Sequence, residues 1–370
     1  MRVLVLNAGS SSLKLSLVDE DDRVLVDREF DVAEGRLDES LVANAVRGME
    51  GIEAIGHRIV HGGPRYRSSV RIDGEVIRYL VTITDLAPLH LPAALAGISA
   101  ARELLPRAPA VACLDTAFHS RMPEAASTYA VPNEWRTRYG IKRYGFHGFS
   151  HAYASRRAAE MLGRSPHDLR VVTCHLGAGA SLAAVRGGRS VDTTMGFTPL
   201  EGLVMATRSG TIDPGALLYL QRHAGKGEPE LSDALDRQGG LFALAGSGDM
   251  REILLRIADG DDAAELAFDV YIHRLRALIA GMAAAMNGLD ALVFTGGVGE
   301  NAAPVRAAAV SGLRFLGVDI GPMLNNTLGP DNDVSAPGAR VPTLVIKAHE
   351  DIEVAREVRR VLASVPRPAG

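Results

Sequence analysis

Two arginines lie in glycine-flanked segments, and both could bind an anion. Arg58 lies in the segment 56–63, Gly-His-Arg-Ile-Val-His-Gly-Gly, and Arg208 lies in the segment 207–210, Thr-Arg-Ser-Gly. Burying a charged side chain is costly unless it has a partner, and a guanidinium group pairs bidentately with a carboxylate or a phosphate. The two arginines therefore predict a clamp for a small anion. A structural ion pair is the alternative for either arginine taken alone.

Three further candidates lie at the ends of predicted elements. Asp115 follows the predicted strand 111–114, so we expect it at the carboxyl end of a strand, where ligands collect in α/β sheets. A helix N-cap is the alternative role for Asp115. His175 ends a strand beside a glycine loop, and His90 precedes a helix, although a lone histidine is more often structural than catalytic. The other histidines are interpreted as structural or surface residues, including His119, His147 and His151.

Small-residue turns offer places to bind phosphate. The segments 7–12, Asn-Ala-Gly-Ser-Ser-Ser, and 177–181, Gly-Ala-Gly-Ala-Ser, let backbone N–H groups approach a phosphate closely. A Walker-type P-loop is excluded, because no Gly-x-x-x-x-Gly-Lys-Ser/Thr motif occurs. The segment 297–302, Gly-Val-Gly-Glu-Asn-Ala, matches a relaxed dinucleotide fingerprint after a strand and before a helical stretch. A dehydrogenase is disfavoured, because this motif lies late in the chain without a βαβ unit of the expected order.

The elements that must position these residues form an internal repeat. Strands are predicted at 3–6, 13–18 and 23–30, and again in the same order at 171–175, 181–186 and 189–194. Each set has a phosphate-sized loop after its first strand, so we expect two related domains that face one ligand, with chance resemblance as the alternative. Helices are predicted at 92–105, 150–162, 264–286 and 351–362, the last packing back on the first half. Strands that alternate with helices predict an α/β fold.

Length, charge and composition limit the function. A chain of 370 residues favours two domains. A net charge of −4 without a basic stripe argues against a nucleic acid partner. The apolar run 277–286 is too short to span a membrane, and 1–6 is too short for a signal peptide, so we expect a cytoplasmic protein. Cys113 and Cys174 lie in apolar runs and are predicted to be buried, reduced thiols that do not act as nucleophiles.

Taken together, these segments resemble the acetate kinase family, of the superfamily that also holds sugar kinases, actin and heat-shock chaperone ATPases. The resemblance spans nearly the whole chain and rests on segments 7–14, 57–63, 85–90, 115–119, 145–148, 175–177, 192–203, 207–210, 212–214, 295–297 and 299–302. It implies two ribonuclease-H-like (actin-like ATPase) domains with a cleft between them. These would comprise residues 1–119 with 352–370, and 120–351, the second also forming a homodimer interface.

The resemblance also implies an activity and the residues that carry it. The chain would transfer the γ-phosphoryl group of ATP directly to acetate, giving ADP and acetyl phosphate without a covalent enzyme intermediate. Arg58 and Arg208 would hold acetate and the transferring group, His175 would stabilise its charge, and His90 would support the site. Mg²⁺, for which Mn²⁺ can substitute, would be positioned by Asn7, Asp115 and Glu350. An acetate methyl pocket would be formed by Val60, Leu89 and Pro199. Nucleotide and phosphate would be bound by Lys14, His175, Gly177, Gly179, Asp249, Met250, Arg251, Gly297, Val298 and Asn301.

The sequence departs from the family pattern in places. Ala178 and Leu91 each stand where asparagine is usual, and Thr211 stands where an acidic residue is common. The segment 347–351, Lys-Ala-His-Glu-Asp, is a loose version of Pro-Thr-Asn-Glu-Glu. An enzyme discriminates only modestly between acids that differ by one or two methylene groups. A propionate or butyrate kinase is therefore the nearest alternative. A catalytically silent nucleotide sensor of the same fold is another.

Overall fold

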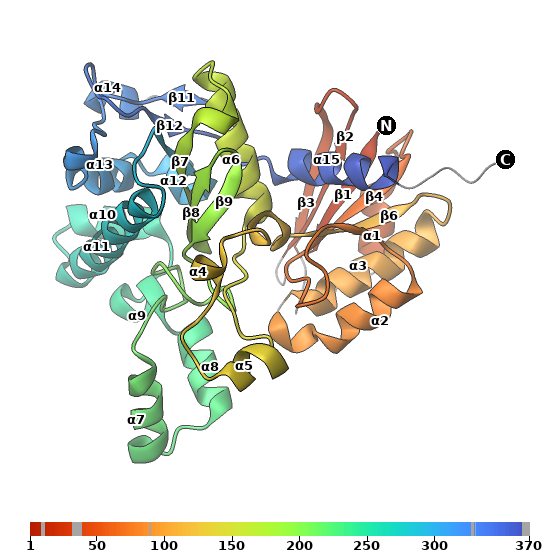
Figure 1. The fold of residues 1–370 in the computed structure, drawn as a ribbon, viewed down its shortest axis with the longest axis horizontal. Helices are drawn as coiled ribbons and strands as arrows, with labels where there is room; N and C mark the ends of the chain where they lie inside the picture. The colour runs from red at the N-terminus through yellow and green to blue at the C-terminus, as the bar shows by residue number, and fades with distance from the viewer. Residues whose placement is uncertain (9–11, 32–38, 89, 327–328, 330, 365–370) are drawn as a thin grey trace. The chain divides into compact units, whose positions relative to one another are not determined.

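The computed structural model describes residues 1–8, 12–31, 39–88, 90–326, 329 and 331–364 (Figure 1). It divides into two compact units, which we describe separately. The first comprises residues 1–120, 146–153 and 349–370, and the second comprises 121–145 and 154–348. The domain limits given above stay a prediction.

The first unit contains a six-stranded mixed sheet in the order β3-β2-β1-β4-β6-β5. Strands β1, β4 and β6 are parallel, whereas β2, β3 and β5 run antiparallel to their neighbours. The strands are β1 (Val3–Ala8), β2 (Ser12–Val18), β3 (Val24–Asp31), β4 (Ala54–Ile59), β5 (Val70–Arg71) and β6 (Ala110–Leu114). The helices are α1 (Glu39–Val46), α2 (Gly74–Thr82), α3 (Leu91–Leu104) and α15 (Glu350–Ala363), with short 3₁₀ turns η2 (Thr84–Leu86) and η3 (Ala117–His119).

Alternating apolar residues give this sheet two buried faces. Leu4 and Leu6 of β1 point to one face, in a cluster that includes Ala93 of α3, and Val3 and Val5 point to the other face. On that second face the sheet packs against the apolar side of α15, whose buried residues are Ile352, Val354, Ala355, Val358 and Val361 (Figure 1). The prediction that the last helix packs on the first half of the chain is therefore confirmed.

The second unit repeats the same topology, with a mixed sheet in the order β11-β12-β10-β7-β8-β9. The strands are β7 (Arg170–Leu176), β8 (Ala180–Arg186), β9 (Arg189–Thr193), β10 (Ala291–Thr295), β11 (Asn332–Asp333) and β12 (Thr343–Val345). In both sheets the first three strands form an antiparallel meander, and the fourth pairs in parallel with the first. The internal repeat predicted from the sequence is therefore present in the fold.

Helices surround the second sheet. They are α4 (Glu124–Ser127), α5 (Asn133–Arg138), α7 (Pro214–Ala224), α8 (Glu228–Asp236), α9 (Gly240–Ala245), α10 (Met250–Ala258), α11 (Asp262–Ala285), α12 (Gly296–Asn301), α13 (Ala303–Ser311) and α14 (Pro322–Asn325), with 3₁₀ turns η4 (Pro166–Asp168) and η5 (Arg314–Leu316). Helix α6 (Gly148–Met161) contributes its first six residues to the first unit. The long helix α11 packs on β7 and β8 through residues that include Ile272, Leu275 and Ile279. Within the described ranges, none of the helices has the length and apolar character needed to cross a membrane.

One detail differs from the sequence prediction, and another agrees with it. The glycine motif 297–302 does not simply precede a helix, because most of it forms the short helix α12 directly after β10. The Glu300 carboxylate stabilises this turn by accepting a hydrogen bond from the Gly296 N–H at 2.9 Å. Cys113 and Cys174 are free and buried, as predicted.

Candidate active site

In the first unit, the neighbouring parallel strands bring three predicted site residues together. Arg58 is the penultimate residue of β4, Asp115 directly follows β6, and Asn7 lies near the end of β1. Arg58 Nη2 donates to Asp115 Oδ2 at 2.8 Å, and Nη1 donates to Asn7 Oδ1 at 3.3 Å. The carboxyl ends of adjacent parallel strands lie at one edge of a sheet, which explains this grouping.

A fourth predicted residue comes from the far end of the chain. Glu350 is the first residue of α15, and its Oε2 lies 3.3 Å from Arg58 Nε. Burial disfavours the charged guanidinium, but the carboxylates of Asp115 and Glu350 outweigh that effect and raise the pKa of Arg58 above its ordinary value. Arg58 is therefore a permanently charged centre that already binds two carboxylates of its own unit.

Asp115 keeps one carboxylate oxygen open. Its side chain is only 1% exposed. Oδ2 accepts hydrogen bonds from Arg58 and from the His147 N–H at 3.1 Å, whereas Oδ1 has no hydrogen-bond partner among the described residues. Buried acceptors normally have a hydrogen-bond donor or a bound ion or water, so Oδ1 is suited to coordinate a cation. Together with the oxygens of Asn7 and Glu350, Oδ1 offers the hard ligands that Mg²⁺ prefers.

This donor set is small. Among the residues that the structure describes, no group of three or more His, Cys, Asp or Glu side chains could hold a metal ion by itself. Mg²⁺ is commonly bound by one or two carboxylates together with water and substrate phosphates. The group around Asp115 therefore fits such an ion, and it does not fit an ion that needs a complete cage of protein ligands.

The turn that carries His147 was missed by the sequence interpretation. His147 has φ 56°, unusual for a residue other than glycine, and its N–H donates to Asp115. A side chain at Gly148 would collide with the Asp115 carbonyl oxygen, so this approach requires glycine. The signal was present in the glycines on both sides of 146–147, which mark a turn that packs tightly against Asp115.

The remaining candidates of the first unit are less tightly grouped. His90 is half-buried and begins α3, and Val60 is half-buried against the apolar cluster that includes Ile59. Lys14 lies on β2, where its ammonium group forms an exposed ion pair with Glu29 at 3.1 Å. Leu89, like residues 9–11 of the first glycine-serine loop, lies outside the described residues.

In the second unit, Arg208 has a very different environment. It lies in the segment 194–213, which contains no helix or strand. Arg208 Nη1 donates to the carbonyl oxygen of Pro199 at 3.3 Å, and its Nε lies 3.9 Å from Asp236 Oδ1. Burial lowers the pKa of Arg208, and Asp236 only partly opposes this. Among the described residues no carboxylate pairs closely with Arg208, so an incoming anion would supply the missing counter-charge.

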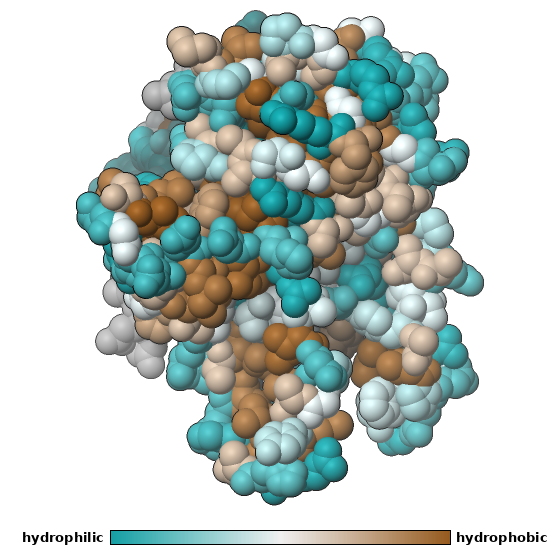
Figure 2. All heavy atoms as spheres, turned by 90° about the vertical axis from the view of Figure 1, so that its left-hand side faces the viewer, coloured by the Kyte–Doolittle hydropathy of each residue, from teal (hydrophilic) through white to brown (hydrophobic). Residues whose placement is uncertain are grey.

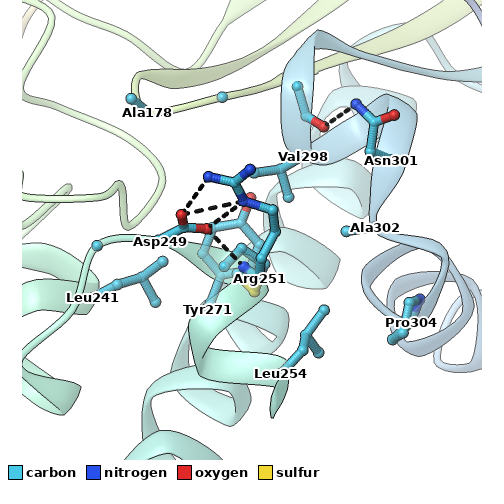
Figure 3. Close-up of a pocket in the computed structure, with 14 residues that line it drawn as sticks. Ala178, Leu241, Asp249, Arg251, Leu254, Tyr271, Val298, Asn301, Ala302 and Pro304 are labelled. Carbon is cyan, nitrogen blue, oxygen red and sulfur yellow. Dashed lines mark hydrogen bonds and ion pairs between the residues drawn. The ribbon is translucent and has the colours of Figure 1, made fainter. Parts of the chain in front are cut away.

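A cavity of about 590 Å³ lies in the same unit (Figure 3). Its lining includes the predicted residues Gly177, Asp249, Met250, Arg251, Gly297, Val298 and Asn301. The volume suits a drug-sized or nucleoside-sized ligand. His175 and Gly179 are not part of this lining, but the Gly177 N–H donates to the Gly179 carbonyl at 3.0 Å, and His175 lies at the end of β7 just before Gly177.

The walls of the cavity come from helices α9 to α13 and from the loop after β7. Figure 3 shows Asp249, the N-cap of α10, and Arg251 of α10 facing each other, with Arg251 Nη2 2.6 Å from Asp249 Oδ2. Hydrogen bonds from Arg251 lower the pKa of Asp249 to about 2. On the α12 side, Asn301 Nδ2 donates to the Gly297 carbonyl at 2.9 Å. The sequence analysis did not identify the further lining residues Leu241, Leu254, Tyr271 and Pro304.

Comparison with known proteins agrees with this geometry. The profile of the acetokinase family matches residues 28–356. The chain belongs to this family. It is 47% identical to an acetate kinase of Gloeobacter violaceus, over 96% of this chain and 98% of that protein. A crystal structure of Porphyromonas gingivalis acetate kinase superimposes with a TM-score of 0.89 at 36% identity, covering 98% and 99% of the two chains. A Francisella tularensis propionate kinase gives a TM-score of 0.90 at 36% identity, covering 97% and 99%.

Family membership confirms two predictions made from the sequence. The fold is the α/β class with two actin-like ATPase domains, each built on a six-stranded mixed sheet. The activity is that of a carboxylate kinase, a phosphotransferase, with acetate kinases among its relatives at 41–47% identity over nearly the full length. The dehydrogenase alternative is thereby set aside.

Proposed function

We propose that this kinase transfers the γ-phosphoryl group of ATP reversibly to acetate, giving acetyl phosphate and ADP. The observation that carries the proposal is Arg208, a largely buried guanidinium without a close carboxylate among the described residues. Such a group is suited to bind the anion of a transferring phosphoryl group. The acetate kinase names of the relatives support acetate as the acceptor.

The nucleotide would bind in the cavity between α10, α11 and α12. Gly177 and Gly297 both line the cavity, and the space beside Gly297 is open, since nothing lies within 4 Å of a Cβ placed there. Phosphate oxygens could therefore approach the backbone at Gly297. Asp249 and Arg251 would lie at the adenosine end. The apolar side chains of Leu254 and Tyr271 would cover the face of the base.

Asn7, Asp115 and Glu350 would hold the divalent cation, directly or through water. The open Oδ1 of Asp115 supports this assignment. When bound, Mg²⁺ would neutralise charge on the phosphate oxygens, and Mn²⁺ could take the same oxygen ligands. Arg58 would then have two tasks, since it binds Asp115 and Glu350 and would also contribute positive charge toward acetate.

The reaction needs no covalent enzyme intermediate. A carboxylate oxygen of acetate would attack the γ-phosphorus in line, and the bond between that phosphorus and the oxygen of ADP would break. Acetate is already ionised at neutral pH, so no general base is required. His175 and Arg208 would stabilise charge on the transferring group, with His90 in support. Cys113 and Cys174 are unsuited as nucleophiles, because burial raises the pKa of both thiols.

The acceptor could also be a longer acid. One solved relative is named a propionate kinase and is as similar to this chain in sequence as the solved acetate kinase. Val60, Leu89 and Pro199 would form the pocket for the methyl group of acetate. Only Val60 and Pro199 lie among the described residues, and both are half-buried.

We also propose that the chain forms a homodimer through its second unit. Helices α7 and α8 contain no buried residue, although α7 carries Leu218, Tyr219 and Leu220 at 39–58% exposure. Figure 2 shows hydrophobic side chains on the lower lobe, where α7 lies in Figure 1. A second copy of the chain would cover this surface. Light scattering coupled to size-exclusion chromatography would give twice the monomer mass, and a monomer would refute the proposal.

The deciding assay traps the acyl phosphate with hydroxylamine. Purified protein, ATP and Mg²⁺ would be supplied in parallel with acetate, propionate or butyrate. The highest kcat/KM is expected with acetate. A higher value with a longer acid would move the assignment to that acid, and no product with any acid would favour the silent nucleotide sensor.

A further inference from the structure

The segment 194–213 poses a physical problem. It contains neither helix nor strand, yet it carries both Pro199 and Arg208. Irregular segments longer than about 12–15 residues are uncommon inside compact domains and are usually functional. Backbone hydrogen bonds hold part of it, such as those from the Ala206 N–H to the Ala178 carbonyl and from the Ser209 N–H to the Leu235 carbonyl, both at 3.1 Å. Side-chain hydrogen bonds add support on both sides of Pro199.

Three side chains provide such a support, which we call the 143–201–129 brace. Arg143 Nη2 donates to Glu201 Oε1 at 2.6 Å, and Tyr129 donates its hydroxyl hydrogen to Glu201 Oε2. Arg143 and Glu201 are only 17% and 32% exposed. The partly buried, hydrogen-bonded carboxylate of Glu201 therefore joins two residues that are distant from it in the sequence.

The brace also binds the backbone of the segment directly. Arg143 Nη1 donates to the carbonyl oxygens of Thr193, Thr194 and Met195 at 3.0–3.2 Å. The Tyr129 hydroxyl oxygen accepts from the Phe197 N–H at 3.1 Å. A side chain at Gly196 would overlap both Glu201 and Tyr129, so the backbone comes as close to the brace as glycine allows. Both sides of Pro199 are thereby held, at 193–197 and at Glu201.

A short series of bonds leads from the brace to Arg208. Gly202, next to Glu201, donates its N–H to Thr211 Oγ1 and accepts from the Thr211 N–H, both at 3.0 Å. The turn of Arg208 closes through its carbonyl, which accepts from the Met205 N–H at 3.1 Å. Its guanidinium binds the Pro199 carbonyl. The two halves of the segment are therefore locked to each other, and the brace anchors one half to the body of the unit.

We infer that Glu201, through this brace, positions Arg208 and Pro199 for phosphoryl transfer. The inference rests on the proposed role of Arg208. Among the described residues Arg208 has only a weak ion pair, with Asp236 at 3.9 Å, so the backbone around it largely sets its position. Loss of the Glu201 charge would loosen the segment and displace the guanidinium, while α10, α11 and α12 would still form the nucleotide cavity.

The first test compares Glu201→Gln with Glu134→Gln, which removes a carboxylate from an exposed pair with Arg138 at 2.9 Å in the same unit. Small displacements of positioning groups can cost about 100-fold in rate. We expect Glu201→Gln to lower kcat about 10- to 100-fold with the KM for ATP changed less than about twofold, and Glu134→Gln to change neither. Tyr129→Phe removes one bond of the brace and should show the same pattern more weakly. It also serves as the test if Glu201→Gln does not fold. The inference would be overturned if kcat were unchanged in both brace variants, or if the affinity for ATP fell by as large a factor as kcat.

A double-mutant cycle with Arg208→Ala separates positioning from general structural support. If Glu201 acts through Arg208, adding Glu201→Gln to Arg208→Ala should lower kcat by less than about threefold more, because residues that act as a unit are not additive. Fully additive losses would overturn the inference. Near-normal turnover of Arg208→Ala alone would instead refute the proposed role of Arg208.

Discussion

The two arginines that suggested an anion clamp have opposite environments. Arg58 lies on a strand and binds Asp115 and Glu350, which raise its pKa despite burial. Arg208 lies in an irregular segment, binds a carbonyl oxygen, and has its pKa lowered by burial. The first arginine pairs closely with two carboxylates of its own unit, whereas the second has a weaker ion pair, with Asp236 at 3.9 Å.

This difference indicates how one residue type serves two purposes. The charge of Arg58 pairs with the buried carboxylate of Asp115 and the partly buried one of Glu350, so we expect it to stabilise the fold. The charge of Arg208 is compensated only weakly, by Asp236 at 3.9 Å, so under the proposal it is free to bind a substrate anion. Uncompensated charge at a site is typical of residues retained for function. Four experiments would sharpen or break this comparison.

The largest effect is expected for Arg208→Ala. Removing an arginine that stabilises a transferring phosphoryl group can cost about 10³-fold or more in kcat. The free energy of unfolding should change by less than about 1 kcal/mol, because no close ion pair is lost. Acyl phosphate formation and urea unfolding would measure the two quantities. An active variant, or one that is strongly destabilised, would contradict the contrast with Arg58.

Arg58→Ala should affect stability as well as activity. It leaves Asp115 buried without its cation, and breaking a buried ion pair in this way costs about 3–5 kcal/mol. Urea unfolding in the absence of Mg²⁺ would measure the loss. The matched control is the double variant Arg58→Ala with Asp115→Asn, which removes the stranded charge and should regain part of the stability. If Arg58→Ala alone were as stable as Arg208→Ala, the two arginines would not differ in their contribution to stability.

The unit that contains Arg58 should also be sensitive to acid. Burial lowers the pKa of His57, the neighbour of Arg58 in β4, to about 3, and burial likewise lowers the pKa of His119 to about 4. Below the unfolded value near 6.5, the unfolded chain binds protons that the folded chain does not. The free energy of unfolding should therefore not depend on these histidines above about pH 6.5. Below that pH it should fall by about 1.4 kcal/mol per pH unit for each histidine as the pH drops toward 4.

Urea unfolding of the two units across this pH range would test the prediction. His57→Gln should make the pH dependence shallower, whereas His167→Gln, at the surface of the second unit, should leave it unchanged. An unchanged slope in His57→Gln would show that this histidine does not carry the acid sensitivity.

The smallest effect is expected for a third arginine, Arg251, whose side chain is 88% exposed beside Asp249. An exposed ion pair contributes about 0–1 kcal/mol. Arg251→Ala should raise the KM for ATP by no more than about tenfold and leave kcat unchanged. Steady-state kinetics with varied ATP would measure this. A large fall in kcat would mean that exposure does not separate Arg251, proposed to bind the nucleotide, from Arg58 and Arg208, proposed to act in catalysis.

The sequence alone determined the repeat and much of the first site. Strands with alternating apolar residues and loops of small residues can be recognised from short stretches of sequence. The repeated order of strands and loops in the two halves could therefore be inferred before the sheets were known. Asp115 was placed correctly after β6, because the end of a strand is visible as the end of an apolar run. The glycines around His147 were visible too, although their meaning was missed.

The tertiary structure decided which partners these residues have. Glu350 reaches Arg58 only because α15 packs on the first sheet. Glu201 meets Arg143 and Tyr129 across separations of 58 and 72 residues. Leu254 and Tyr271 enter the cavity from neighbouring helices. Periodicity records which face of an element is buried, but not which other element covers that face. The sequence therefore identified the chemical groups and the repeat, and long-range packing decided that Arg58 pairs closely with two carboxylates while Arg208 lies 3.9 Å from one.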